Sequence, residues 1–114
     1  IDGREMEQNW LRKIGMPREI IMRHRSTHFA HIFANSYAAG YYSYLWSEVL
    51  DTDGFEAFRD KGSPFDPEIA RRLYTYIYSA GGTKDPMELY ESFRGRKPDS
   101  GALMRHRGFA PPKN

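Results

Sequence analysis

Histidine and tyrosine side chains are concentrated in residues 23–46, RHRSTHFAHIFANSYAAGYYSYLW. This segment holds three histidines and four tyrosines, and it contains no acidic residue. Buried tyrosine hydroxyls need hydrogen-bond partners, so a hydrophobic core seldom uses so many of them. A site that holds a peptide or a developing negative charge can use such donors. The candidate residues for such a site are His31, Tyr37, Tyr41 and Tyr44.

The spacing of the tyrosines also fits a structural role. Tyr37, Tyr41, Tyr44 and Glu48 follow one another at steps of four, three and four residues, which makes one stripe if a helix begins as early as Tyr37. Tyr37 could instead lie in the preceding loop. Because a tyrosine stripe at helical spacing is more often core or interface than active site, the spacing alone favours the structural role.

The histidines have the spacing of a zinc site on a helix but lack its other parts. His24, His28 and His31 are separated by four and three residues, as zinc ligands on one helical face can be. The motif H-E-x-x-H is absent, and no carboxylate lies nearby in the sequence as a third ligand. We therefore expect His24 and His28 to form hydrogen bonds in a semi-buried loop, and we expect these 114 residues to bind no metal.

Basic residues gather near the C-terminus: Arg94, Arg96, Lys97, Arg105, His106 and Arg107. They would suit a stand-alone helical module that binds nucleic acid or a protein partner, and we keep this as the alternative function. Cations near the C-terminal ends of helices explain them more simply. The net charge of +2, from 17 basic and 15 acidic residues, is too small to indicate a nucleic-acid or membrane partner by itself.

Helix start and stop signals divide the chain into about five helices. The dipeptides Asp66-Pro67 and Asp85-Pro86 each combine an N-cap with proline at the first helical position, and glycines follow the expected helix ends. No segment alternates as a strand between hairpin turns. We predict an all-α fold that forms one helical unit over residues 1–114, with a flexible tail at 111–114. The predicted helices span residues 2–14, 38–60, 66–80, 85–94 and 100–107, and a short helix is expected at 19–22.

Composition restricts the remaining choices. The chain has no cysteine, which excludes disulfides and thiolate metal ligands. No apolar run reaches the roughly 20 residues of a membrane helix. Since the first residue is Ile1 and not Met, we expect an internal fragment of a longer protein, with a trimmed tag as the alternative. We expect a cytoplasmic location, with the periplasm as the alternative.

Two long stretches resemble one known family. FAHIFANSYAAGYYSYLWSEV, residues 29–49, closely resembles the C-terminal catalytic region of the thimet oligopeptidase and peptidyl-dipeptidase family of zinc metallopeptidases. The pattern F-x-H-I-F followed by Y-A-A-G-Y-Y-x-Y-L-W is similar to the peptidyl-dipeptidase (dipeptidyl carboxypeptidase) branch. Residues 62–110, with their D-P, F-R-G-R and H-R-G elements, are similar to the family's closing helices.

This resemblance implies an all-α fold of two lobes beside a channel, short peptide substrates, and zinc held by H-E-x-x-H and a later Glu. Those ligands would lie upstream of Ile1, so the resemblance implies that the fragment alone is inactive and needs the rest of the catalytic domain. By the family pattern, His31, Tyr37 and Tyr44 contact the peptide and Tyr44 donates to the oxyanion. Tyr41 matches a further tyrosine of the pattern.

Two further expectations follow from the resemblance. The family's loop between the histidine and the first tyrosine is usually rich in glycine, whereas this chain has Ala34-Asn35-Ser36, which puts in doubt how freely the loop closes. A piece cut from a larger domain should also expose apolar surface and could self-associate. The candidates for this surface are Trp46, Leu50 and Phe58.

Overall fold

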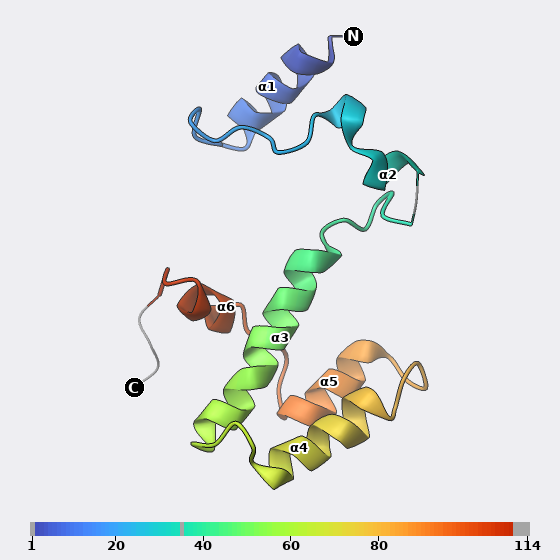
Figure 1. Ribbon diagram of the computed structural model, residues 1–114, viewed down its shortest axis with the longest axis vertical. Coiled ribbons are helices and arrows are strands. Elements are labelled where there is room, and N and C mark those ends of the chain that lie inside the picture. The colour runs from blue at the N-terminus through green and yellow to red at the C-terminus, as the bar shows by residue number, and fades with distance from the viewer. Residues whose placement is uncertain (1, 35, 111–114) are drawn as a thin grey trace. The chain divides into compact units, whose positions relative to one another are not determined.

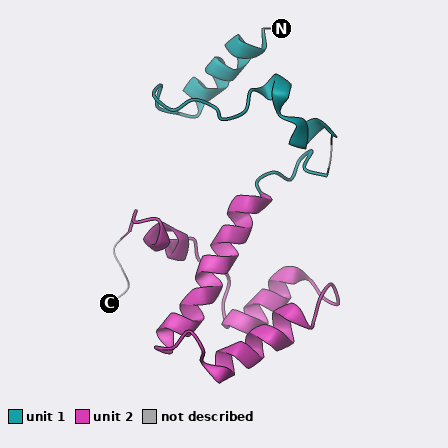
Figure 2. Ribbon diagram, viewed as in Figure 1, with its two compact units in different colours: residues 1–42 teal, residues 43–114 magenta. Residues whose placement is uncertain are grey.

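A computed structural model describes residues 2–34 and 36–110 of the chain. The chain forms two compact units, residues 1–42 and residues 43–114 (Figure 2). Within the described ranges the secondary structure is helical, with no β-strand, so the predicted all-α class is confirmed. The expected flexible tail at 111–114 and the loop position Asn35 lie outside the described residues.

The N-terminal unit contains the helices α1 (Gly3–Lys13) and α2 (Ala30–Ala34) and a 3₁₀ turn, η1 (Ser26–His28) (Figure 1). α1 begins at an aspartate cap, since the Asp2 carboxylate accepts hydrogen bonds from the backbone N–H groups of Arg4 and Glu5. Gly15 follows the helix with a φ of 72°, which a residue with a side chain rarely adopts. The sequence signals therefore place both ends of α1.

The C-terminal unit begins with the longest helix, α3 (Ser43–Asp60). It continues through α4 (Pro67–Leu73), the π-helical turn η2 (Tyr74–Tyr78), α5 (Pro86–Arg94) and α6 (Gly101–His106). Asp66 caps α4 and Asp85 caps α5 through their carboxylates, as predicted from the two Asp-Pro pairs. Figure 1 shows α5 and α6 lying beside α3, and the contacts between α3 and α6 are extensive.

One hydrophobic core lies in the C-terminal unit, where α3, α4, η2 and α5 meet. Its buried residues are Ala57, Phe58, Ile69, Tyr90 and Phe93, with Leu50, Leu73 and Ile77 packed against them. The inward face of α5 is formed by Leu89, Tyr90 and Phe93, which are all buried. This core fixes α3, whose first turn carries Tyr44, against α5.

The predicted helices differ from the structure at several places. Residues 19–22 form no helix. Pro17 starts only a single turn, which is closed by a 3.0 Å hydrogen bond from the Ile20 N–H to the Pro17 carbonyl. Helix nucleation is unfavourable, and so short a segment forms too few further hydrogen bonds to offset its free-energy cost. The helix expected from residue 38 starts at Ser43. Gly40, which costs about 1 kcal/mol in a helix interior, lies in the preceding turn. The short helix α2 was not predicted.

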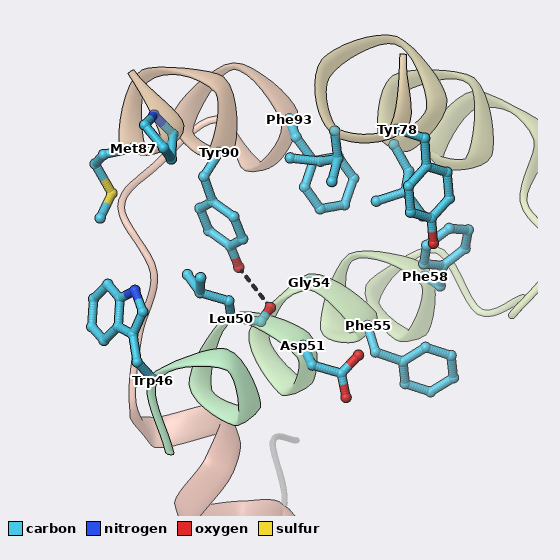
Figure 3. Close-up of a pocket in the computed structure, with 13 residues that line it drawn as sticks. Trp46, Leu50, Asp51, Gly54, Phe55, Phe58, Tyr78, Met87, Tyr90 and Phe93 are labelled. Atoms are coloured by element: carbon cyan, nitrogen blue, oxygen red, sulfur yellow. Dashed lines mark hydrogen bonds between the residues drawn. The ribbon is translucent and has the colours of Figure 1, made fainter. Parts of the chain in front are cut away.

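Apolar surface remains exposed on the C-terminal unit. Trp46 is exposed, as predicted, and Leu50 is half-buried, but the prediction is wrong for Phe58, which packs in the core at 8% exposure. A cavity of about 490 Å³ opens between α3, η2 and α5. Figure 3 shows Trp46 and Met87 at one end of it and Phe58 and Tyr78 at the other. Among the described residues, no helix is long and apolar enough to cross a membrane.

Candidate functional site

His31, Tyr37 and Tyr41 lie together in the N-terminal unit. The centroid of the His31 ring is 6.0 Å from that of Tyr37 and 5.4 Å from that of Tyr41, and the two phenol rings are 5.9 Å apart. His31 comes from α2, whereas both tyrosines lie in the turns that precede α3. The helical stripe considered for these tyrosines is therefore not formed, yet the turns bring three of the four candidate residues into one cluster.

Two further rings support this cluster, and the sequence analysis did not assign them to the site. Phe29 packs edge-on against Tyr41 at 4.6 Å, and His24 stacks on Phe29 at 4.9 Å with an interplanar angle of 12°. Edge-to-face and offset-stacked pairs of this kind are favourable arrangements of aromatic rings. Phe29 belongs to the F-x-H-I-F element, so that element was the signal that could have identified it. We call these five rings, His24, Phe29, His31, Tyr37 and Tyr41, the ring cluster.

The segment between His24 and Phe29 of the ring cluster is tied to α1 by a buried carboxylate. Glu7 accepts 2.7 Å hydrogen bonds from the backbone N–H and the hydroxyl of Ser26, and a 3.0 Å bond from the Arg25 guanidinium. These donors, the Ser26 groups first and then Arg25, lower the pKa of Glu7 to about 2. Glu7 is therefore ionised at neutral pH and holds η1, which lies between His24 and Phe29 of the ring cluster, against α1.

The semi-buried loop predicted for the first two histidines is correct for one of them. His24 is half-buried beside Phe29, whereas His28 is exposed at the end of η1. Within residues 2–34 and 36–110, no group of three or more histidine and carboxylate side chains is placed to hold a metal ion.

Tyr44 lies on the first turn of α3, in the C-terminal unit, and 56% of it is exposed. Its helix is held by a fully buried carboxylate, Asp53, at 0% exposure. Asp53 accepts hydrogen bonds from the Tyr90 hydroxyl at 2.6 Å and from Arg96 Nη2 at 2.5 Å, and it lies 3.3 Å from Arg94 Nε. α3 is thereby joined to the F-R-G-R element.

The electrostatics of this buried group follow from its partners. Burial opposes ionisation of Asp53, but the hydrogen bonds from Tyr90 and Arg96 and the charges of Arg94 and Arg96 lower its pKa below the ordinary value. Burial, together with the hydrogen bond to Asp53, raises the pKa of Tyr90. The hydroxyl thus stays protonated and donates, and the carboxylate stays charged.

Two more arginines of the C-terminal basic group pair with carboxylates on α3. Arg105 Nε and Nη2 lie 2.8 and 2.7 Å from the two oxygens of Glu56. Arg107 binds Glu48 in the same two-point manner, with Nε 3.0 Å from Oε1 and Nη2 on Oε2. These internal pairs give the basic group a structural role and do not favour the alternative of a nucleic-acid-binding module.

Comparison with known proteins identifies the family. The model of Peptidase family M3 matches residues 4–109. Oligopeptidase A of Haemophilus influenzae is 49% identical over 81 residues, which cover 71% of this chain and 12% of that protein. Oligopeptidase A of Escherichia coli is 48% identical over 81 residues with the same coverage. Dipeptidyl carboxypeptidase of Escherichia coli is 42% identical over 87 residues, covering 76% of this chain and 13% of that protein.

Oligopeptidase A and dipeptidyl carboxypeptidase are both among these relatives, in agreement with the family resemblance of residues 29–49 and 62–110. The chain spans about an eighth of the length of the curated relatives it matches. The family match extends over both compact units, including the ring cluster, Tyr44 and the arginine-rich C-terminal elements. The chain belongs to peptidase family M3.

Proposed function

We propose that this chain is the C-terminal segment of a zinc-dependent oligopeptidase or peptidyl-dipeptidase and that it supplies the residues that hold the peptide. The observation that carries this proposal is the ring cluster, in which His31, Tyr37 and Tyr41 meet in a chain of peptidase family M3. The names of the relatives, oligopeptidase A and dipeptidyl carboxypeptidase, agree with short peptides as the substrate class.

The chemistry of the ring cluster suits a peptide backbone. Phenol hydroxyls and an imidazole donate hydrogen bonds to peptide carbonyls and accept them from peptide N–H groups. Residues 23–46 contain no carboxylate, so no negative charge in that segment would repel a peptide's C-terminal carboxylate or an oxyanion. We propose that His31 and Tyr37 hold the peptide and that Tyr41 adds a weaker contact.

We propose a separate role for Tyr44. Its hydroxyl would donate a hydrogen bond to the oxygen that gains negative charge as the peptide carbonyl is attacked. A donor of this kind contributes most when a rigid element holds it, because little reorganisation is then needed during the reaction. α3 provides such an element, since the hydrophobic core and the buried Asp53 hold it.

Peptidase family M3 is zinc-dependent in general, and the described residues do not offer a zinc site. We propose that the zinc of the complete enzyme is held outside this chain and that the chain alone is inactive. We also propose that the apolar cavity between α3, η2 and α5 is covered by the rest of the peptidase, because the relatives are about eight times longer than the matched region. We retain a cytoplasmic location as part of this proposal.

The test is peptide hydrolysis by the complete protein that carries this chain. We expect cleavage of short peptides, with the products identified by mass spectrometry to separate dipeptide release from internal cleavage. His31→Ala should lower kcat/KM about 3- to 10-fold, the equivalent of one hydrogen bond of roughly 1 kcal/mol. His28→Ala is the matched control, because His28 is exposed and outside the ring cluster. Absence of hydrolysis contradicts the function, and equal activity of the two variants contradicts the role of His31.

A further inference from the structure

Four carboxylates along α3, those of Glu48, Asp53, Glu56 and Asp60, are each paired with an arginine from residues 94–107 of the chain. Asp53 and Glu56 lie in the buried half of the helix and help to hold the C-terminal unit together. Glu48 differs from them, because its ion pair with Arg107 lies near the start of α3 and is partly open to solvent. Its location suggests a role other than stability.

Glu48 stands one helical turn after Tyr44. Residues four apart on an α-helix lie on the same face with their Cβ atoms roughly 5–6 Å apart, so Glu48 and Tyr44 project from the same face of α3. An unpaired carboxylate at that place would oppose negative charge near the Tyr44 hydroxyl. The guanidinium of Arg107 neutralises it through two parallel hydrogen bonds.

Arg107 is itself held in a defined place. It ends α6, where its backbone N–H donates to the Leu103 carbonyl at 2.9 Å, and Gly108 then turns the chain with a φ of 75°. α6 packs against α3, and Figure 1 shows it beside that helix. The guanidinium therefore reaches Glu48 from a defined helix end. Its two hydrogen bonds to the Glu48 carboxylate restrain the orientation of the face of α3 that carries Tyr44.

We propose that Arg107 is a positioning residue for Tyr44 and acts through Glu48. It sets the orientation of the first turns of α3 and removes the negative charge beside the Tyr44 hydroxyl. This inference rests on the proposed role of Tyr44 as a donor to the oxyanion. It assigns a function to the H-R-G element that its basic character alone did not indicate.

The test compares Arg107→Ala with Lys61→Ala in the complete peptidase. The two cations are matched, since their side chains are 46% and 47% exposed and each pairs with a glutamate. For Arg107→Ala we expect kcat to fall about 3- to 10-fold with little change in KM, because small misplacement of a catalytic donor lowers the rate of the chemical step. Lys61→Ala should leave both constants unchanged. Arg107→Lys should recover part of the loss, since it restores the charge but not the two-point geometry.

A second background shows whether the effect passes through Tyr44. In the Tyr44→Phe enzyme, Arg107→Ala should cause no further loss of kcat, because the hydroxyl that it positions is gone. An additional loss of the full size in that background overturns the inference, as does an unchanged kcat for Arg107→Ala alone. If Tyr44→Phe by itself leaves kcat unchanged, the proposed role of Tyr44 fails and the inference fails with it. Equal thermal midpoints of Arg107→Ala and Lys61→Ala show that both variants are folded.

Discussion

Replacing Asp53 with alanine should strongly destabilise the C-terminal unit. The substitution removes a carboxylate at 0% exposure that accepts hydrogen bonds from Tyr90 and Arg96 and pairs with Arg94. The Arg94 side chain is only 8% exposed, so its charge would remain buried without this partner. Removing one member of a buried ion pair costs about 3–5 kcal/mol, a large share of the roughly 5–15 kcal/mol by which a domain is stable.

The measurement is urea unfolding of the purified protein, followed by circular dichroism and by tryptophan fluorescence. Tyr90→Phe should cost less than Asp53→Ala, about 1–3 kcal/mol, because the carboxylate keeps both arginines and loses a single donor. Lys84→Ala, which breaks an exposed pair with Glu88, should stay within about 0.5 kcal/mol of the unmodified protein. If Asp53→Ala were no more destabilising than Lys84→Ala, the role of Asp53 in holding α3 would be refuted.

Three further predictions concern other parts of the chain. The pKa of Glu7 is lowered from 4.5 to about 2, so the stability that its ionised carboxylate provides is present above pH 4.5 and is lost as the pH falls toward 2. Glu7→Gln should reduce this pH dependence of stability, measured by hydrogen exchange of the α1 amides. Gly54→Ala should stabilise the protein by about 0.5–1 kcal/mol in thermal unfolding, because alanine favours a helix interior and its Cβ would meet Phe93 at an ordinary contact distance of 3.5 Å. Gly95→Ala should destabilise it, because the φ of 79° at this position strains a residue with a side chain. The isolated chain should hydrolyse no peptide with added zinc, and peptide cleavage would contradict this expectation. It should also self-associate through its exposed apolar surface, and a strictly monomeric sedimentation profile would contradict that.

Local signals in the sequence predicted most helix boundaries. The aspartate caps at Asp2, Asp66 and Asp85 act within three residues of themselves, so a reading of neighbouring residues finds them. The start of α3 was predicted five residues too early, because the apolar periodicity continues through Gly40 while the backbone does not. Periodicity describes which residues can share a face, but it does not show where a glycine ends the helix.

Long-range features could not be predicted in the same way. Asp53 meets its arginines across more than 40 residues of sequence, and nothing near Asp53 in the sequence identifies such partners. Phe58 is a candidate for exposed surface only because the chain is expected to be part of a larger domain. Its neighbours in the core, on α4 and α5, are distant in sequence, so neighbouring residues do not reveal its burial. For the candidate site, the family resemblance supplied the residues and their expected roles. The structure then brought His31, Tyr37 and Tyr41 together and added His24 and Phe29.

The most direct test of the central claim is the turnover number of the complete peptidase with Tyr44→Phe. The substitution removes only the hydroxyl, and Tyr44 is exposed on the first turn of α3, so folding should be unaffected. We predict that kcat falls roughly 100-fold or more, as expected for loss of one oxyanion donor, while KM and the zinc content stay close to those of the unmodified enzyme. An unchanged kcat would contradict the claim that this chain supplies a donor to the reaction.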